Sequence, residues 1–209
     1  QFVRADADLF TSTEVIQAEH RVLDAAQRTV VPHVHAEHFR AAESAHTGPL
    51  NDAQRDVARA FACDDKLFTV AVGPAGTGKT TSLGLAADAI HAADRQVIGL
   101  APTAAAASVM GQDMGAEATT IDAFLMDKGR GIGPSQLRPG DVLIVDEVGM
   151  VTTPKLAELL DHAQRSGAQV RGIGDDRQLG AIGSGGALRL VTNEVGARRL
   201  DEVHRFRTP

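Results

Sequence analysis

The apolar positions of the chain follow two patterns, short runs that are mostly apolar and longer segments with helical spacing. The short runs are typical of buried parallel strands. They occupy residues 67–72, 97–101, 141–145 and 169–173. Segments with an apolar residue every three or four positions predict helices at 51–62, 79–92, 103–114, 154–165 and 186–192. This alternation predicts an α/β fold in which right-handed crossovers build a parallel sheet with helices on both faces.

Two further segments have weaker patterns. Residues 119–126 predict a short helical turn, and the glycine-rich stretch 128–134 predicts a loop.

The first 48 residues differ in character from the rest. Thr11 and Glu14 have the spacing of a capping box, and an apolar residue recurs at helical spacing from Val15 to Ala26. A turn signal, Thr-Gly-Pro at 47–49, then interrupts the chain. We therefore predict a helical N-terminal segment over residues 1–48 and a second domain over residues 49–209.

Three histidines, His33, His35 and His38, lie within six positions. His35 and His38 could share a helix face and bind a metal, but no nearby acid or cysteine completes a set of ligands. A polar, solvated helix is the favoured interpretation. Because Cys63 is the sole cysteine, an intrachain disulfide or a cysteine zinc cluster is excluded.

The composition of the chain is that of a globular domain rather than a membrane protein. The chain has 209 residues, is 43% hydrophobic and has a mean hydropathy of -0.10, values that are typical of a globular domain. No apolar run approaches the length of about 18 residues that a membrane helix requires, and no signal peptide is visible. These features predict a cytoplasmic protein without a membrane partner. A net charge of -6 argues against a broad basic face for duplex DNA but permits single-strand binding.

A glycine-rich motif of the form G-x-x-x-x-G-K-[ST] follows the strand predicted at 67–72 and opens the helix predicted at 79–92. Its residues are Gly73, Pro74, Ala75, Gly76, Thr77, Gly78, Lys79, Thr80 and Thr81. Backbone N–H groups and the positive end of the helix dipole would face an anion here. In this motif Lys79 reaches the β- and γ-phosphates and the Thr80 hydroxyl ligates Mg²⁺. The alternative is a glycine-rich turn that binds nothing.

Two acids, Asp146 and Glu147, end the strand predicted at 141–145, and ligands bind at this edge of a parallel sheet. Asp146 is placed to hold Mg²⁺, and Glu147 to orient or deprotonate an attacking water. Capping of the next helix is the alternative role. Gln178 follows the strand predicted at 169–173, where its amide could sense a γ-phosphate. A simple turn there is equally compatible with the sequence.

Taken in order, these segments resemble the superfamily 1 DNA helicases of the RecD-like branch. The chain is similar to the family motifs at LNDAQ (50–54), GPAGTGKTT (73–81), LAPTAAAAS (100–108), TTIDAFL (119–125), VDEVGM (145–150), GDDRQL (174–179) and LDEVHRF (200–206). Segments before, between and after these motifs are similar to the helicase region of TraI/TrwC-type conjugative relaxases. The chain has no tyrosine, so it cannot perform the tyrosine-based nicking of a relaxase domain.

The resemblance implies a RecA-like P-loop NTPase domain that uses ATP and Mg²⁺ to move on single-stranded DNA. By motif position, Gln54 would read adenine, although Asn51 and Gln54 also have the spacing of a helix capping pair. Arg205 would approach the γ-phosphate, with a surface ion pair as the alternative. Thr103 and Thr120 would contact DNA, unless they only cap helices.

The resemblance also sets expectations for the chain in isolation. The family's motifs V and VI belong to a second RecA-like domain, which would follow Pro209 in the same polypeptide. We therefore expect the chain alone to be a monomer that binds nucleotide weakly and hydrolyses it slowly. A stand-alone RecD-like helicase, a recombination-complex subunit and a non-catalytic binding module remain as alternatives. The alanines at 104–107 replace a glycine and basic or polar residues that are common in the family, which weakens the expectation of strand contacts there.

Overall fold

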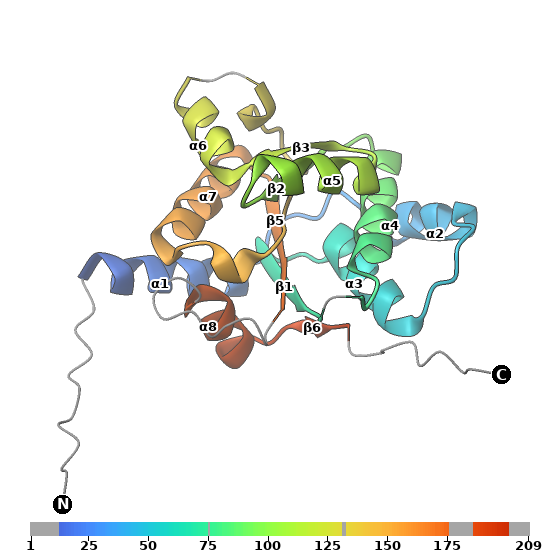
Figure 1. Ribbon diagram of the computed structural model, residues 1–209, viewed down its shortest axis with the longest axis horizontal. Helices are drawn as coiled ribbons and strands as arrows, with labels where there is room; N and C mark the ends of the chain where they lie inside the picture. Colours follow the sequence, from blue (N-terminus) through green and yellow to red (C-terminus); the bar gives the residue numbers. More distant parts are fainter. Residues whose placement is uncertain (1–12, 75, 131–132, 176–185, 201–209) are drawn as a thin grey trace, which may run out of the picture.

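The computed structural model describes residues 13–74, 76–130, 133–175 and 186–200. In this part of the chain a parallel β-sheet lies between two layers of helices (Figure 1). The strands are β1 Phe68–Val72, β2 Val97–Ala101, β3 Glu117–Thr120, β4 Val142–Val145, β5 Gln169–Gly174 and β6 Arg198–Arg199. The helices are α1 Thr13–Gln27, α2 Ala36–Ala45, α3 Asp52–Cys63, α4 Lys79–Ala92, α5 Ala104–Met114, α6 Ile121–Arg130, α7 Thr153–Ser166 and α8 Gly186–Glu194. Two short 3₁₀ helices are η1 Gly133–Ser135 and η2 Val148–Met150.

All the strand pairs are parallel, in the order β3-β2-β4-β5-β1-β6. β5 lies between β1 and β4, and the carboxyl ends of these strands reach the same edge of the sheet. The segment after β1 carries the glycine-rich motif, and the segment after β4 carries the acidic pair. The topology thus confirms the expected RecA-like α/β fold and brings the two motifs to one edge.

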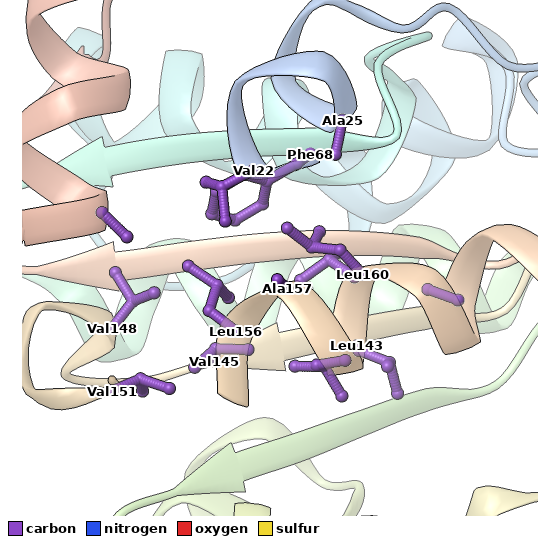
Figure 2. Packing of buried hydrophobic residues seen from close by; sticks show 14 of the residues in the cluster. Val22, Ala25, Phe68, Leu143, Val145, Val148, Val151, Leu156, Ala157 and Leu160 are labelled. Carbon is purple, nitrogen blue, oxygen red and sulfur yellow. The ribbon is translucent and has the colours of Figure 1, made fainter. Parts of the chain in front are cut away.

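One face of the sheet packs against α1, α6, α7 and α8. Figure 2 shows Val22 of α1 beside Phe68 of β1, and Leu156 of α7 beside Val145 of β4. These four side chains are at most 1% exposed. Burying an aliphatic or aromatic side chain of this size contributes about 1.5–3 kcal/mol, so this core holds the helices on the sheet.

The opposite face packs against α2, α3, α4 and α5. Its core includes Phe61 of α3, Ile90 of α4 and Ile144 of β4, all of them 0% exposed. Since β4 buries Ile144 on this face and Val145 on the other, its apolar run fits a strand that is covered on both sides.

Most of the predicted elements begin and end within two residues of their predicted bounds. The helix over 79–92 and the strand over 97–101 agree to the residue, and Gly115 ends α5 with φ +60° as a left-handed C-cap. The prediction of a helical turn over 119–126 was wrong at its start, because Thr119 and Thr120 belong to β3 and pair with Leu100 and Ala101 of β2.

The loop predicted over 128–134 was also wrong in part. Helix α6 continues to Arg130, and η1 begins at Gly133. A glycine at 129 is tolerated inside α6 at a cost of about 1 kcal/mol relative to alanine.

The described part of the N-terminal segment contains helices α1 and α2, as predicted, and it packs on the rest of the molecule, whereas Thr11 of the predicted capping box lies outside the described residues. Ala18 and Val22 of α1 are 0% exposed in the core that also contains Phe68. His35 precedes α2, and its N–H donates to Nδ1 of His38 at 3.0 Å. The described residues contain no group of three or more side chains that could hold a metal ion. A domain boundary at residue 48 remains a prediction.

A buried arginine joins α3 to β5. The Arg171 side chain is 0% exposed, and its guanidinium donates to the backbone oxygens of Phe61, Asp64, Lys66 and Val170 at 2.8–3.1 Å. Burial lowers the pKa of Arg171 to about 10, so the side chain stays charged at neutral pH. The guanidinium therefore satisfies carbonyls at the carboxyl end of α3, where a cation is favourable.

Across the described ranges, every helix is too short or too polar to span a lipid bilayer.

Candidate nucleotide-binding site

The glycine-rich segment after β1 forms the loop that leads into α4. Gly78 has φ +87°, and a Cβ at this position would lie 1.8 Å from Nε2 of Gln54. Glycine is required there for two reasons, the left-handed backbone and the close approach of Gln54. Helix α4 begins at Lys79 immediately after it. The unpaired N–H groups of the first turn of α4 can therefore bind an anion.

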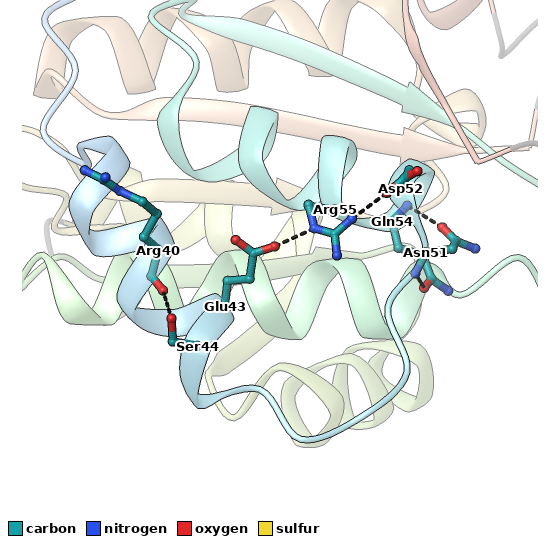
Figure 3. A network of polar contacts seen from close by, with 7 residues as sticks. All are labelled: Arg40, Glu43, Ser44, Asn51, Asp52, Gln54 and Arg55. Carbon is teal, nitrogen blue, oxygen red and sulfur yellow. Dashed lines mark hydrogen bonds and ion pairs between the residues drawn. The ribbon is translucent and has the colours of Figure 1, made fainter.

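Gln54 braces this loop from α3. Its side chain is 4% exposed and forms a reciprocal capping box with Asn51, which Figure 3 shows. The amide Nε2 also donates to the backbone oxygen of Thr77 at 3.4 Å. Gln54 therefore caps α3, as one of the two predicted roles requires. It also contacts the loop, which the sequence did not indicate. The reading of adenine by Gln54 remains a prediction.

Figure 3 also shows an ion pair that joins α3 to α2. Arg55 pairs with Glu43 of α2 and with Asp52 of its own helix. These ion pairs lie at the surface and are partly exposed, so solvent screens them and their contribution to stability is small.

The acidic pair follows β4. Oδ1 of Asp146 accepts a hydrogen bond from the Glu147 N–H at 2.9 Å. A carboxylate has about four acceptor sites, so Asp146 can keep this bond and still bind a cation. Glu147 has φ +48°, a left-handed conformation that costs a non-glycine residue about 1–2 kcal/mol. Its Oε1 lies 3.6 Å from Nζ of Lys79, so the fold brings the two motifs together.

A single cleft contains both motifs, with a volume of about 720 Å³. It is lined by Gly76, Gly78, Lys79, Thr80, Leu83, Ala105, Ala106, Val109, Met110, Asp113, Met114, Asp146 and Glu147. Among the described residues that line this space are three carboxylates and one ammonium group. The carboxylates would repel a polyphosphate, and a divalent cation bound with it would offset that repulsion.

The donor set suits Mg²⁺. The Thr80 hydroxyl and the Asp146 carboxylate both line the cleft, and hard oxygen ligands of this kind are what Mg²⁺ prefers. Mg²⁺ commonly binds through one or two protein oxygens and the phosphates of a substrate. The predicted ligands Thr80 and Asp146 therefore fit this ion.

Asp113 of α5 was not predicted as part of the site. Its Oδ2 accepts a hydrogen bond from Oγ1 of Thr80 at 3.4 Å. One signal for it exists in the sequence, since Asp113 is the only charged residue between Ala104 and Met114. The spacing alone could not show which helix this face of α5 meets.

Thr103 and Thr120 lie at the same edge of the sheet as the cleft. Thr103 follows β2 and accepts a hydrogen bond from the N–H of Ala106, and Thr120 ends β3 and accepts one from Ala123, each at 3.2 Å. Both threonines therefore cap helices, and contact with DNA remains a prediction for each.

Three predicted residues, Ala75, Gln178 and Arg205, lie outside the described residues. Asp175, which follows β5, is 8% exposed. The remaining members of the glycine-rich motif lie between β1 and the first turn of α4, where they were expected.

A parallel sheet with a phosphate loop after β1 and an acidic pair after β4 defines a P-loop nucleotide-binding domain. A family model described as an AAA domain matches residues 49–209. The chain belongs to the AAA domain family.

The chain is also similar in sequence to several curated proteins. The probable conjugal transfer protein TraA of Sinorhizobium fredii is 30% identical over 208 residues, which are 98% of this chain and 18% of that protein. The ATP-dependent RecD2 DNA helicase of Deinococcus radiodurans is 33% identical over 66% of this chain and 19% of its own length. The multifunctional conjugation protein TraI of Escherichia coli is 30% identical over 71% of this chain and 9% of its own length.

The chain spans less than a fifth of each of these three relatives. Together with the family match they confirm the resemblance to RecD-like helicase domains near the TraI/TrwC relaxases.

Proposed function

We propose that this chain is the ATP-binding motor domain of a DNA helicase that acts on single-stranded DNA, within a conjugative relaxase-helicase. The observation that carries the proposal is the meeting of Lys79 with Glu147 at 3.6 Å, in one cleft with Thr80 and Asp146. These residue types in this arrangement fit a nucleoside triphosphate with its cation.

The chemistry would be attack of water on the γ-phosphate. Thr80 and Asp146 would hold Mg²⁺, which when bound neutralises charge on the phosphates. Lys79 would bind the β- and γ-phosphates, and Glu147 would orient the water or take its proton. Gln178 would sense the γ-phosphate, and Arg205 would approach it.

The residues at the edge of the sheet that carries the cleft indicate the proposed partners. Thr103 and Thr120 end or follow strands at this edge, so a single strand of DNA could contact both along the sheet. A second RecA-like domain of the same polypeptide would close over the nucleotide. The cytoplasm is the location that fits such work on DNA.

The extent of the similarity favours a conjugative protein over a stand-alone helicase. The match to TraA covers 98% of the chain, whereas the match to the RecD2 helicase covers 66%. The match to TraA therefore includes most of the helical segment before residue 49 as well as the P-loop domain.

Replacement of Lys79 tests the nucleotide assignment. We expect Lys79→Ala to weaken ATP affinity by about 10- to 100-fold in the presence of Mg²⁺, because a charge-assisted hydrogen bond contributes about 1.5–3 kcal/mol. Calorimetric titration of ATP into the 209-residue chain measures this change. The matched control is Lys155→Ala, which removes an ammonium that pairs with Asp122 away from the cleft. Equal affinities in the Lys79 variant and the parent would refute the proposal.

A further inference from the structure

Asp113 is the carboxylate of the cleft that the sequence motifs do not explain. It lies one position before the end of α5 and lines the cleft together with Lys79, Asp146 and Glu147. Its Oδ2 accepts the hydrogen bond from the Thr80 hydroxyl. It therefore touches one of the two proposed Mg²⁺ ligands.

The packing of two helices sets the position of Asp113. Thr80 and Gly84 are four residues apart on α4, so they lie on the same face of that helix. A Cβ at Gly84 would be 3.4 Å from the backbone oxygen of Asp113. A glycine inside a helix costs about 1 kcal/mol relative to alanine, and here it lets α5 approach α4 closely beside Thr80. The close approach of the two helix backbones thus accounts for the contact between Asp113 and Thr80.

We propose that Asp113 is a positioning residue that orients the Thr80 hydroxyl for Mg²⁺. This inference rests on the proposed function. A hydroxyl has one proton and two lone pairs, so a proton donated to Asp113 leaves both lone pairs available to a cation. Partners of this kind, which hold a metal ligand in its orientation, commonly change metal affinity by 10- to 100-fold when they are lost. Because Asp113 is solvent-exposed, the effect should fall at or below the lower end of that range.

A purely electrostatic role makes a different prediction. If the negative charge of Asp113 alone attracted the cation, then Asp113→Asn and Asp113→Ala would weaken Mg²⁺ binding equally. If the carboxylate orients Thr80, the amide oxygen of asparagine can still accept the proton, whereas alanine cannot. Comparison of the two variants therefore separates orientation from charge.

The experiment measures the affinity of the 209-residue chain for a fluorescent ATP analogue, once with MgCl₂ and once with EDTA. The readout is the ratio of the two affinities, which a general loss of structure would not change selectively. We expect Asp113→Ala to reduce this ratio by about 5- to 10-fold and Asp113→Asn by less than about 2-fold. In a Thr80→Val background, Asp113→Ala should cause no further reduction, because the two residues act as a unit.

Asp88→Ala is the matched control, since Asp88 is an exposed helical carboxylate of α4 that does not line the cleft. It should leave the ratio unchanged. Equal reductions in the alanine and asparagine variants of Asp113, or no reduction in the alanine variant, would overturn the positioning role while nucleotide binding stands. A parent chain that bound the analogue equally with MgCl₂ and EDTA would overturn the Mg²⁺ part of the proposed function and this role with it.

Discussion

Glu147 combines an unfavourable backbone conformation with a contact at the centre of the site. Its left-handed φ of +48° turns the chain directly after β4, and its carboxylate lies against Lys79. Strained residues persist where the surrounding structure holds them, and they concentrate at functional sites. Here the turn allows two consecutive acids, Asp146 and Glu147, to line one cleft, with Glu147 beside Lys79.

Replacement of Glu147 by glutamine should separate hydrolysis from binding. Glutamine keeps the shape of the side chain but cannot take a proton, so we expect ATP hydrolysis to fall by about 10²- to 10⁴-fold. ATP affinity should stay within a few-fold of the parent. Single-turnover phosphate release, in a longer polypeptide that includes the proposed second RecA-like domain, measures the chemical step.

Glu117→Gln is the control for this variant, because Glu117 is exposed on β3 and does not line the cleft. A Glu147→Gln variant that released phosphate as fast as the control would exclude Glu147 as the general base.

At the residue scale, the motifs predicted Lys79, Thr80, Asp146 and Glu147, and these four line one cleft. They were predictable because each follows a strand end whose place in a parallel sheet is known in advance. Asp113 was not predictable, since its role depends on the contact between two helices.

Arg171 illustrates how one side chain can join separate elements. It donates to carbonyls at the end of α3 and in the following turn, and it belongs to the central strand β5. Gln169 of the same strand donates to the backbone oxygens of Asp64 and Lys66 as well. The connection between α3 and β1 is thus fixed to β5 by buried hydrogen bonds.

Replacement of Arg171 by methionine should therefore destabilise the fold. It removes the donor to the buried oxygen of Phe61 and leaves the oxygens of Asp64 and Lys66 with Gln169 alone, so we expect the free energy of unfolding to fall by about 3 kcal/mol. Urea unfolding followed by circular dichroism measures this change, which suits a chain without tryptophan or tyrosine. Arg189→Met on the exposed face of α8 should change stability by less than about 0.5 kcal/mol. Similar midpoints for both variants would contradict the proposed role of Arg171.

The elements differed in how well the sequence predicted them. β4 and α4 were clear, because β4 is a continuous apolar run and α4 opens directly at the glycine-rich motif. β3 was missed because Glu117–Thr120 is polar and partly exposed at the edge of the sheet, and only its pairing with β2 makes it a strand. Such pairing depends on residues far along the chain, so local patterns carry little information about it.

At the scale of the whole molecule, the N-terminal helices share the cores of the P-loop domain. Helix α1 packs beside α7 and α8 on one face of the sheet, and α2 packs beside α4 on the other (Figure 1). The family match begins at residue 49, yet Val22 is buried with Phe68 and Leu156. Residues 13–45 therefore contribute to the stability of the sheet that holds the site.

A charge at Val22 should destabilise the entire fold. Val22 is 0% exposed, and Val22→Asp would bury a carboxylate without a partner, so we expect a loss of about 3 kcal/mol or more. The urea transition should stay single and move to lower urea as a whole. His20→Asp, on the exposed side of α1, is the control and should leave the midpoint nearly unchanged. An unchanged midpoint for Val22→Asp would mean that α1 is not integral to the domain.

The position of β5 between β1 and β4 sets the distance between the backbone of the phosphate loop and that of the acidic pair. Neighbouring strands lie about 4.8 Å apart, so the backbones of the phosphate loop and the acidic pair are separated by roughly 10 Å across the end of β5. The side chains of Lys79 and Glu147 reach across that gap and meet at 3.6 Å. A chain of phosphates with its cation is long enough to contact the backbone of the phosphate loop and the acidic pair at the same time, whereas a single phosphate can reach both only through side chains.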